Sequence, residues 1–433
     1  MKFPQKFIDE EITEQDVLCD NSNSYQPGFM QIHLICHYRG SFKEMDSLKD
    51  KGSFLHEYIH YLQNLTTPWG LYTSMVEYQF IVEHFKYIQE HTDIVLPLQI
   101  KLNEQIKSRI DIISVGNGEN PLKQNYGNRK IDRNTKILWH RKLKNINGKN
   151  YPYIILDIKC EDDVKSVNMG AYIIKESMAA LYQMQLDPSA THPEYDLPYN
   201  VVKILAEQHF PNIANDDKKL ISICYLSLFS LSPGEVLIEQ LDFANQNTDL
   251  TGIQLIERFI EENKIRINDE GHINVFDFYD KISTRFEEIL KVSLQIKELD
   301  YIHEALQRAK LSKGIIPIIS PLYEKGINEE IIQELIDMMG IPYIYTDYNE
   351  YHYPQSTKNE RESPDMIALI GQHALFSFLV RPNIYRCCPL KYMCKDSPFD
   401  KDECFDYPWN GTKCPMTIMG DTLSMKNKNV SWS

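Results

Sequence analysis

The stretch SFLHEYIHYLQNL, residues 53–65, restricts the fold of this chain more than any other segment. Its hydrophobic residues recur at intervals of three and four, which is the spacing of a helix with one apolar face. That face collects Leu55, Tyr58, Ile59, Leu62 and Leu65. The opposite face contains His56, Glu57 and His60. We therefore predict an amphipathic helix that holds two imidazoles one turn apart, with a carboxylate between them.

His56, Glu57 and His60 form the pattern H-E-x-x-H, which has two interpretations. Imidazoles at positions i and i+4 project side by side and can bind one Zn²⁺, while the intervening carboxylate reaches a water on the metal and acts as general base. Alternatively, the three side chains are only the solvated face of an amphipathic helix. With 13 histidines in 433 residues, the pattern would arise by chance on the order of a few per cent of the time, which favours the metal site.

Through His56, Glu57 and His60 the sequence resembles the zincin metallopeptidases. The match covers about a dozen residues and so indicates a superfamily rather than one enzyme. The resemblance implies a zinc-dependent peptidase that acts on a protein or peptide substrate, with Glu57 as catalytic base. It also implies an α+β fold, predominantly helical, with a small mixed sheet beside the active-site helices. By analogy, a selective cytoplasmic protease in a bacterial toxin, stress or antiviral system fits this description.

A catalytic zinc site takes three protein ligands and leaves one position for water, so a third side chain is required. Extended metzincin motifs place a third histidine shortly downstream, where this chain has Gln63 and Asn64. The resemblance therefore narrows to the gluzincins, in which the third ligand is a glutamate on a separate helix.

Glu176, in GAYIIKESMAALYQ, is the first candidate for this third ligand. Its neighbours at helical spacing are apolar, and a buried carboxylate needs a cation, a hydrogen-bonding partner or a metal. Pairing with an arginine or lysine is the ordinary alternative. Glu77 and Glu83 on the next predicted helix are nearer in sequence, and Glu235 or Glu239 is more remote. The sequence leaves the choice among these glutamates open.

The resemblance also implies a strand that binds substrate and a donor that stabilises the substrate oxygen. Met30–Tyr38 alternates apolar and polar residues, and Tyr151–Cys160 has the composition of a strand. An extended peptide would bind along one of these strands by strand addition. His352 and His373 are candidates for the donor, which must be a His, Tyr or Arg side chain.

The charge balance argues against two classes of partner. The chain has 46 basic and 61 acidic residues, a net charge of −15, whereas nucleic acids and anionic membranes attract positive surfaces. The N-terminal sequence MKFPQKFIDEEITEQD lacks the apolar run of a signal peptide, and no later segment holds about 18 consecutive apolar residues. We therefore expect a cytoplasmic protein without nucleic-acid or membrane partners.

Changes in composition divide the chain into four expected regions. They are an irregular segment at 1–27, a zincin-like catalytic core at 28–195, a helical region at 196–340, and a C-terminal region with a cysteine-rich tail at 341–433. Within the core, the polar and weakly periodic stretch near 100–150 is expected to be an insertion or a long loop.

The tail holds five of the nine cysteines within CCPLKYMCKDSPFDKDECFDYPWNGTKCP. Four of them would supply the thiolates of a structural zinc or iron–sulfur site: Cys388, Cys394, Cys404 and Cys414. Disulfides and free thiols are the alternatives, because no C-x-x-C pair is present. Two other functions therefore remain open, a Cys-ligated metal or redox protein, and an inactive helical binding or regulatory protein in which H-E-x-x-H is coincidental.

Overall fold

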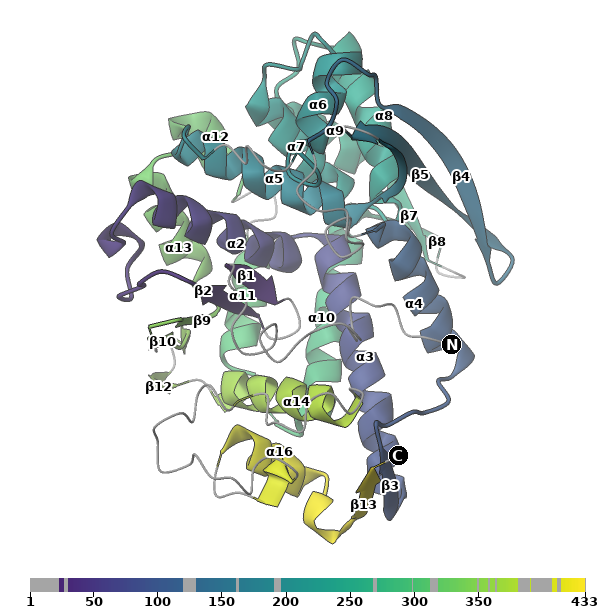
Figure 1. Ribbon diagram of the computed structural model, residues 1–433, viewed down its shortest axis with the longest axis vertical. Coiled ribbons are helices and arrows are strands. Elements are labelled where there is room, and N and C mark those ends of the chain that lie inside the picture. Colours follow the sequence, from purple (N-terminus) through teal and green to yellow (C-terminus); the bar gives the residue numbers. More distant parts are fainter. Residues whose placement is uncertain are drawn as a thin grey trace.

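The computed structural model describes most of the chain (Figure 1). The described residues are 23–26, 30–119, 130–160, 163–190, 196–267, 271–297, 299–311, 318–348, 350–356, 359–362, 364–380, 390, 407–410 and 414–432. Within these ranges the fold is α+β and mostly helical, with small sheets, as the sequence predicted. None of the described helices combines the length and apolar character that a membrane crossing requires.

Helix α2 (Leu48–Thr66) contains the H-E-x-x-H residues and confirms the predicted helix. The Ser47 side chain caps its first turn by accepting a hydrogen bond from the backbone N–H of Asp50 at 3.1 Å. Thr67 separates α2 from α3 (Pro68–Glu90) and caps α3, accepting from the backbone N–H of Gly70 at 3.1 Å. Pro68 is tolerated because a first-turn residue needs no backbone donor.

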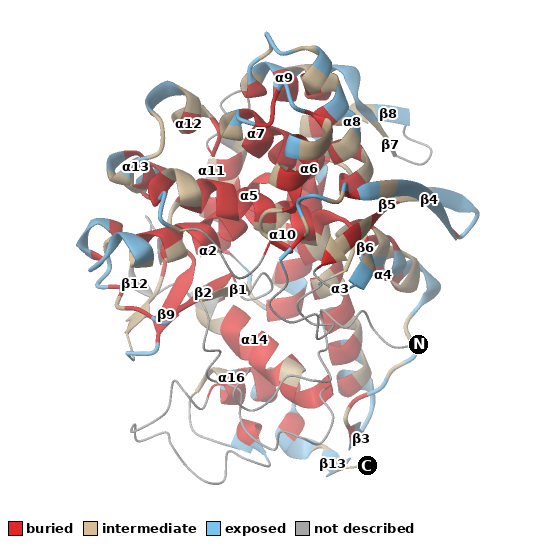
Figure 2. Cartoon of the chain, turned by 45° about the horizontal axis from the view of Figure 1, so that its top comes forward, coloured by how far each residue is buried: buried red, intermediate tan, exposed pale blue. Residues whose placement is uncertain are grey.

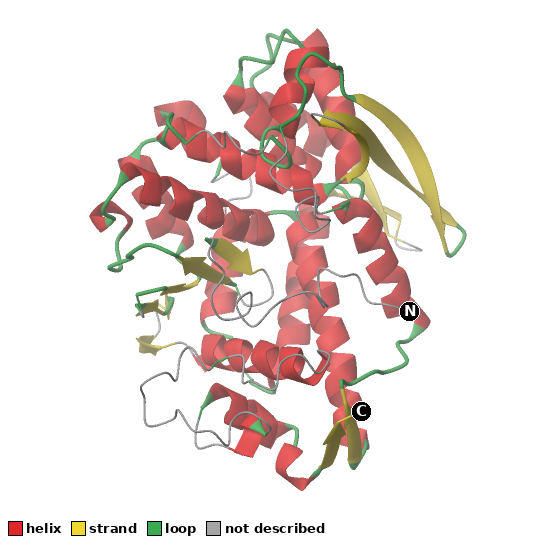
Figure 3. Ribbon diagram, viewed as in Figure 1, coloured by secondary structure: helices red, strands yellow, loops and turns green. Residues whose placement is uncertain are grey.

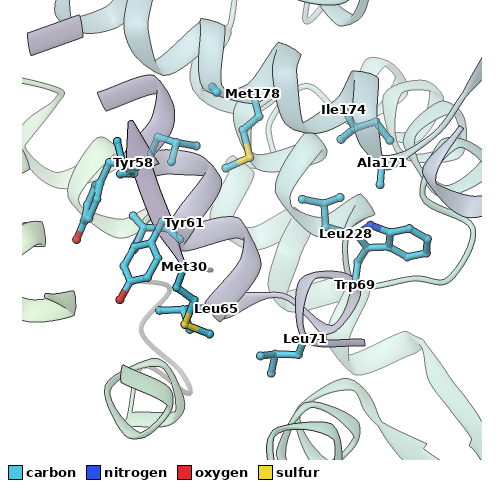
Figure 4. Packing of buried hydrophobic residues seen from close by; sticks show 14 of the residues in the cluster. Met30, Tyr58, Tyr61, Leu65, Trp69, Leu71, Ala171, Ile174, Met178 and Leu228 are labelled. Atoms are coloured by element: carbon cyan, nitrogen blue, oxygen red, sulfur yellow. The ribbon is translucent and has the colours of Figure 1, made fainter. Parts of the chain in front are cut away.

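Helix α5 (Ala171–Leu186) lies along α2 (Figure 1). The two helices approach closely at Gly52, where an added Cβ would lie 3.3 Å from Cγ of Gln183. Figure 4 shows Met178 of α5 in the same hydrophobic cluster as Tyr58 and Leu65 of α2. Burial of these apolar faces is what holds the two helices together.

A four-stranded sheet near α2 has the order β1-β2-β9-β10. Its strands are β1 (Ser24–Gln26), β2 (Gln31–Leu34), β9 (Tyr343–Thr346) and β10 (Tyr351–His352). β2 and β9 are parallel, with Ile32 opposite Ile344, and the other two pairs are antiparallel. Strands from the expected core and from the expected C-terminal region thus share one sheet, and the domain boundaries stay predictions.

A second sheet is an antiparallel meander of order β4-β5-β6. Its strands are β4 (Leu138–Ile146), β5 (Lys149–Cys160) and β6 (Asp163–Met169). The region near 100–150 was expected to be an insertion or a long loop. The long loop is wrong, because the region contains helix α4 (Glu104–Asn117) as well as β4. Most of β4 is exposed, so the strand lacks the alternating apolar pattern by which a sequence reveals one.

Neither strand that was expected to bind substrate is an edge strand. β2 lies between β1 and β9, and β5 lies between β4 and β6. Strand addition requires unpaired backbone groups, which a central strand does not offer. The expectation was therefore wrong for β2 and for the part of β5 that also pairs with β6, Ile154–Cys160. Partner strands such as β9 are distant in sequence, and local patterns do not reveal them.

Further helices and short strands complete the described fold. The helices are α6 (Val201–His209), α7 (Asp217–Ser227), α8 (Pro233–Gln246), α9 (Gly252–Glu262), α10 (Val275–Leu294), α11 (Tyr301–Leu311), α12 (Ser320–Lys325), α13 (Glu329–Met339), α14 (Pro364–Val380) and α16 (Pro415–Thr422). The strands are β3 (Asp93–Leu96), β7 (Lys264–Ile267), β8 (Gly271–Asn274), β11 (Gln355–Ser356), β12 (Asn359–Glu362) and β13 (Asn429–Trp432). Figure 2 shows α2 and α5 largely buried and β4 mostly exposed.

Candidate metal centre

The side chains of the H-E-x-x-H motif are buried. His56, Glu57 and His60 have exposed fractions of 7%, 7% and 6%. The interpretation of this face as a solvated one is therefore wrong, because α5 packs against it. Polar groups that are removed from water require partners, so the contacts of these three residues decide what the site can do.

Glu176 of α5 faces both histidines. Its Oε2 lies 3.2 Å from Nε2 of His56 and 3.5 Å from Nε2 of His60. One potential ligand atom from each of the three residues lies within 4.8 Å of the other two. Within the part of the chain that the structure describes, this is the one group of three His, Cys, Asp or Glu side chains that meets the criterion.

These separations match the edges of a zinc coordination tetrahedron. Bonds of about 2.0–2.1 Å from zinc to nitrogen or oxygen place neighbouring ligand atoms about 3.3 Å apart. The distances from Glu176 to His56 and His60, 3.2 and 3.5 Å, lie on either side of that value. Two histidines and one glutamate with a fourth position for water form a donor set of catalytic zinc sites. The residues present therefore fit Zn²⁺.

Gln63 determines how His60 presents its two nitrogens. The side-chain N–H of Gln63 donates to the carbonyl oxygen of Lys175 at 3.2 Å, which leaves its Oε1 to face His60. Nδ1 of His60 lies 2.9 Å from this oxygen and donates its hydrogen to it. Nε2 of the neutral imidazole then has a lone pair directed at the carboxylate of Glu176. Two acceptors in this position require a cation between them, either a second proton on His60 or a metal ion.

The charge state of Glu176 suits a metal ligand. Burial alone would raise its pKa, because burial disfavours the ionised carboxylate. The neighbouring imidazoles of His60 and His56, which attract and hydrogen-bond the carboxylate when they are protonated, outweigh burial and hold the pKa of Glu176 well below its usual range. The carboxylate is therefore ionised at neutral pH and available as an anionic ligand.

Two tyrosines that the sequence analysis did not single out border the site. The ring of Tyr199 lies 5.8 Å from that of His56, centroid to centroid, at an interplanar angle of 67°. Burial raises the pKa of Tyr172, and electrostatic interactions with Glu176, Tyr199 and Glu57 raise it further. Tyr172 could have been found from its position one helical turn before Glu176, whereas nothing near Tyr199 in the sequence places it beside His56.

The other candidate glutamates lie elsewhere in the fold. Glu83 forms an ion pair of 3.1 Å with a lysine on α3, and Glu235 of α8 pairs with an arginine of β4. Glu77 on α3 and Glu239 on α8 are not part of the group formed by the two histidines. The structure thus brings Glu176 to the histidines and leaves the four alternatives apart from them.

Neither histidine expected to stabilise the substrate oxygen belongs to this group. His352 on β10 packs edge-on against Tyr38, with ring centroids 5.0 Å apart. His373 on α14 lies 3.0 Å from the hydroxyl of Tyr78, and burial lowers its pKa to about 3. Both histidines therefore pack against tyrosines away from His56 and His60, and the expectation that either one stabilises the substrate oxygen has no support in this arrangement.

The expected thiolate site in the tail falls mostly outside the described residues. Cys388, Cys394 and Cys404 lie in that undescribed part. Cys414 is the N-cap of α16, and its sulfur accepts from the backbone N–H of Thr417 at 3.4 Å. The structural metal in the tail stays a prediction.

Comparison with known proteins identified no relative, since no family model, no curated protein and no solved structure matches the chain significantly. The zincin resemblance accordingly stays a prediction from the motif, and the structure adds to it only the grouping of His56, His60 and Glu176.

Proposed function

We propose that this protein is a zinc-dependent peptidase whose metal is bound by His56, His60 and Glu176. The observation that supports this most is the convergence of the three side chains from two helices, with Glu176 at the separations of a coordination tetrahedron from both histidines. A cation at this point also explains why a lone pair of His60 faces an ionised carboxylate. We expect the enzyme to act in the cytoplasm on a protein or peptide substrate.

Glu57 is the proposed general base. Zinc, when bound, lowers the pKa of a water toward about 7 and polarises a substrate carbonyl. Glu57 follows His56 directly on α2, takes the proton of the attacking water on its carboxylate, and passes that proton to the nitrogen of the departing amine. Its exposed fraction of 7% keeps it away from bulk water, which strengthens its interaction with nearby charges.

Tyr199 and Tyr172 replace His352 and His373 as proposed donors to the substrate oxygen. A phenolic O–H donates a hydrogen bond, and the raised pKa of Tyr172 keeps its hydroxyl protonated at neutral pH. Tyr199→Phe should lower kcat by about 10²-fold and leave the zinc content unchanged. Unchanged kcat in both Tyr199→Phe and Tyr172→Phe would remove these residues from the mechanism.

Metal content tests the site directly. The purified full-length protein should contain one zinc, which His60→Ala and Glu176→Ala lose. His91→Ala is the matched control, because His91 is an exposed histidine at the end of α3. If the tail binds a second metal, the same variants reduce the zinc content from two to one. A metal-free wild type, or zinc unaffected by His60→Ala, would contradict the proposal.

Turnover tests the reaction. Glu57→Gln should retain zinc and lose about 10²- to 10⁴-fold in activity, because the amide cannot accept the proton of water. Glu83→Gln, which changes a carboxylate on α3, should keep full activity. Substrates can be found by comparing new peptide termini in cells that express wild type or Glu57→Gln. Zinc binding without any difference in termini would instead favour an inactive binding or regulatory protein.

A further inference from the structure

The segment 130–160 differs in charge from the rest of the molecule. It contains eight basic and two acidic side chains, a net charge of +6, within a chain of net charge −15. The remaining residues therefore carry −21. Five exposed lysines of this segment form no ion pair with a described residue, namely Lys130, Lys136, Lys142, Lys144 and Lys149. Positive charge is thus concentrated in one segment, and the charges of these five lysines are not neutralised by ion pairs with described residues.

Most of this charge lies on the β4–β5 hairpin, which projects from the helical body (Figures 1 and 3). Among the described strands β4 pairs with β5 alone, so its other edge is open. β6 pairs with β5 only over Ile154–Cys160. The outer part of the hairpin, from Lys142 to Tyr153, is therefore a two-stranded ribbon. Such a ribbon is marginally stable by itself and gains stability from a third strand.

Protection against aggregation does not by itself explain the side chains on the open edge of β4. Lysines on an edge strand commonly prevent unwanted pairing, and that role would explain the charges alone. However, Leu138 and Leu143 of β4 have exposed fractions of 54% and 53%. Large apolar side chains on an open edge favour association with another chain. The strand combines apolar and basic side chains with a free edge, which are the features of strand addition.

The strand register shows which backbone groups face the open edge. Pro152 of β5 lies opposite Leu143 of β4. Proline has no backbone N–H, so this pair fits a position without ladder hydrogen bonds. The N–H and C=O groups of Leu143 then point away from β5. Because the pattern alternates along an antiparallel pair, those of Arg141 and Asn145 point the same way.

We propose that the open edge of β4 binds an extended acidic segment of a partner protein by strand addition. The partner's backbone pairs with the outward groups of Leu143 and its alternate neighbours, and its carboxylates contact Lys142 and Lys144. A polypeptide fits better than a nucleic acid, because the open edge offers backbone N–H and C=O groups that another strand can pair with and that a nucleic acid cannot match.

Binding of a defined peptide to the full-length protein tests the charge requirement. A labelled peptide of about ten residues with alternating glutamate and valine should bind in a fluorescence anisotropy assay, and one with alternating lysine and valine should not. Lys142→Glu with Lys144→Glu should weaken binding about tenfold. Lys49→Glu with Lys101→Glu, the same charge change at exposed lysines elsewhere, is the matched control and should retain binding. No binding of the acidic peptide, or equal affinities of the two double variants, would overturn the proposal.

A second pair of variants tests backbone pairing. Leu143→Pro removes the outward N–H and the side chain, whereas Leu143→Ala removes the side chain alone. Strand addition predicts that Leu143→Pro binds the acidic peptide about fivefold more weakly than Leu143→Ala, with unchanged circular dichroism in both. Equal affinities of the two variants would refute pairing at this edge. Tighter binding of a single-stranded DNA than of the peptide, lost in the Lys142/Lys144 variant, would overturn the choice of partner.

Discussion

Replacing Gln63 by leucine tests the hydrogen bond that orients His60. Gln63 is 1% exposed and bridges Nδ1 of His60 and the carbonyl oxygen of Lys175. Leucine has a similar volume but accepts no hydrogen bond, so the His60 imidazole loses the partner that directs its Nε2 lone pair at Glu176. Glutamate at the same position retains an acceptor for His60 but cannot donate to Lys175.

The contacts of Gln63 determine how much zinc affinity and how much stability its replacement should cost. Loss of the group that orients a metal-binding histidine reduces metal affinity by about 10- to 100-fold, which is about 1.4–2.8 kcal/mol. Leaving the buried N–H of His60 unpaired should lower the free energy of unfolding of the zinc-free protein by about 1–3 kcal/mol. Gln63→Leu should therefore lose both affinity and stability. Gln63→Glu should lose stability but keep zinc affinity within about threefold of wild type.

Zinc affinity can be measured by competition with a chromophoric chelator, and stability by urea unfolding of the zinc-free protein. Gln372→Leu is the control, since Gln372 is a buried glutamine on α14 that donates to the carbonyl oxygen of Ser293 at 2.9 Å. It should lose stability and keep zinc affinity. If Gln63→Leu behaves like Gln372→Leu, the orienting role of Gln63 is refuted, while the zinc site itself is unaffected by that result.

Three further predictions concern the stability of the fold. Gly170→Ala should lower the free energy of unfolding by about 1–3 kcal/mol, because a Cβ there would lie 2.4 Å from the carbonyl carbon of Asn117; an unchanged urea midpoint would contradict this packing argument. Burial lowers the pKa of His373 from 6.5 to about 3, so the unfolded chain binds more protons between these values and stability falls as the pH drops through them. His373→Gln should flatten this dependence, and equal slopes of unfolding free energy against pH in the two proteins would show the reasoning to be wrong. Zinc at about 100 times its Kd should stabilise the wild type by about 2.7 kcal/mol and Glu176→Ala by much less, as thermal unfolding with and without a chelator would reveal.

Helix α2 could be predicted from the sequence because its determinants are local. The apolar period, the cap at Ser47 and the break at Pro68 all act within a few residues. The same local reasoning left a solvated polar face of α2 open as the alternative, and the structure shows that this face is buried. Periodicity tells which residues share a face, but whether water or another helix covers that face depends on packing. Glu176 was the first choice among the glutamates because a carboxylate among apolar neighbours needs a partner, and the structure places it beside both imidazoles.

By itself, the sequence determined that two imidazoles and a carboxylate share one helix face. It also determined that Glu176 lies on another helix, with apolar neighbours at helical spacing. Only the tertiary structure decided that this face is covered by α5, that Tyr199 borders His56, and that β2 and β5 are central strands while β4 is an open edge. The physical reason is the range of the interactions. Helix formation depends on contacts three or four residues apart, whereas the meeting of His56 and Glu176 joins residues separated by 120 positions and requires the packing of the whole core.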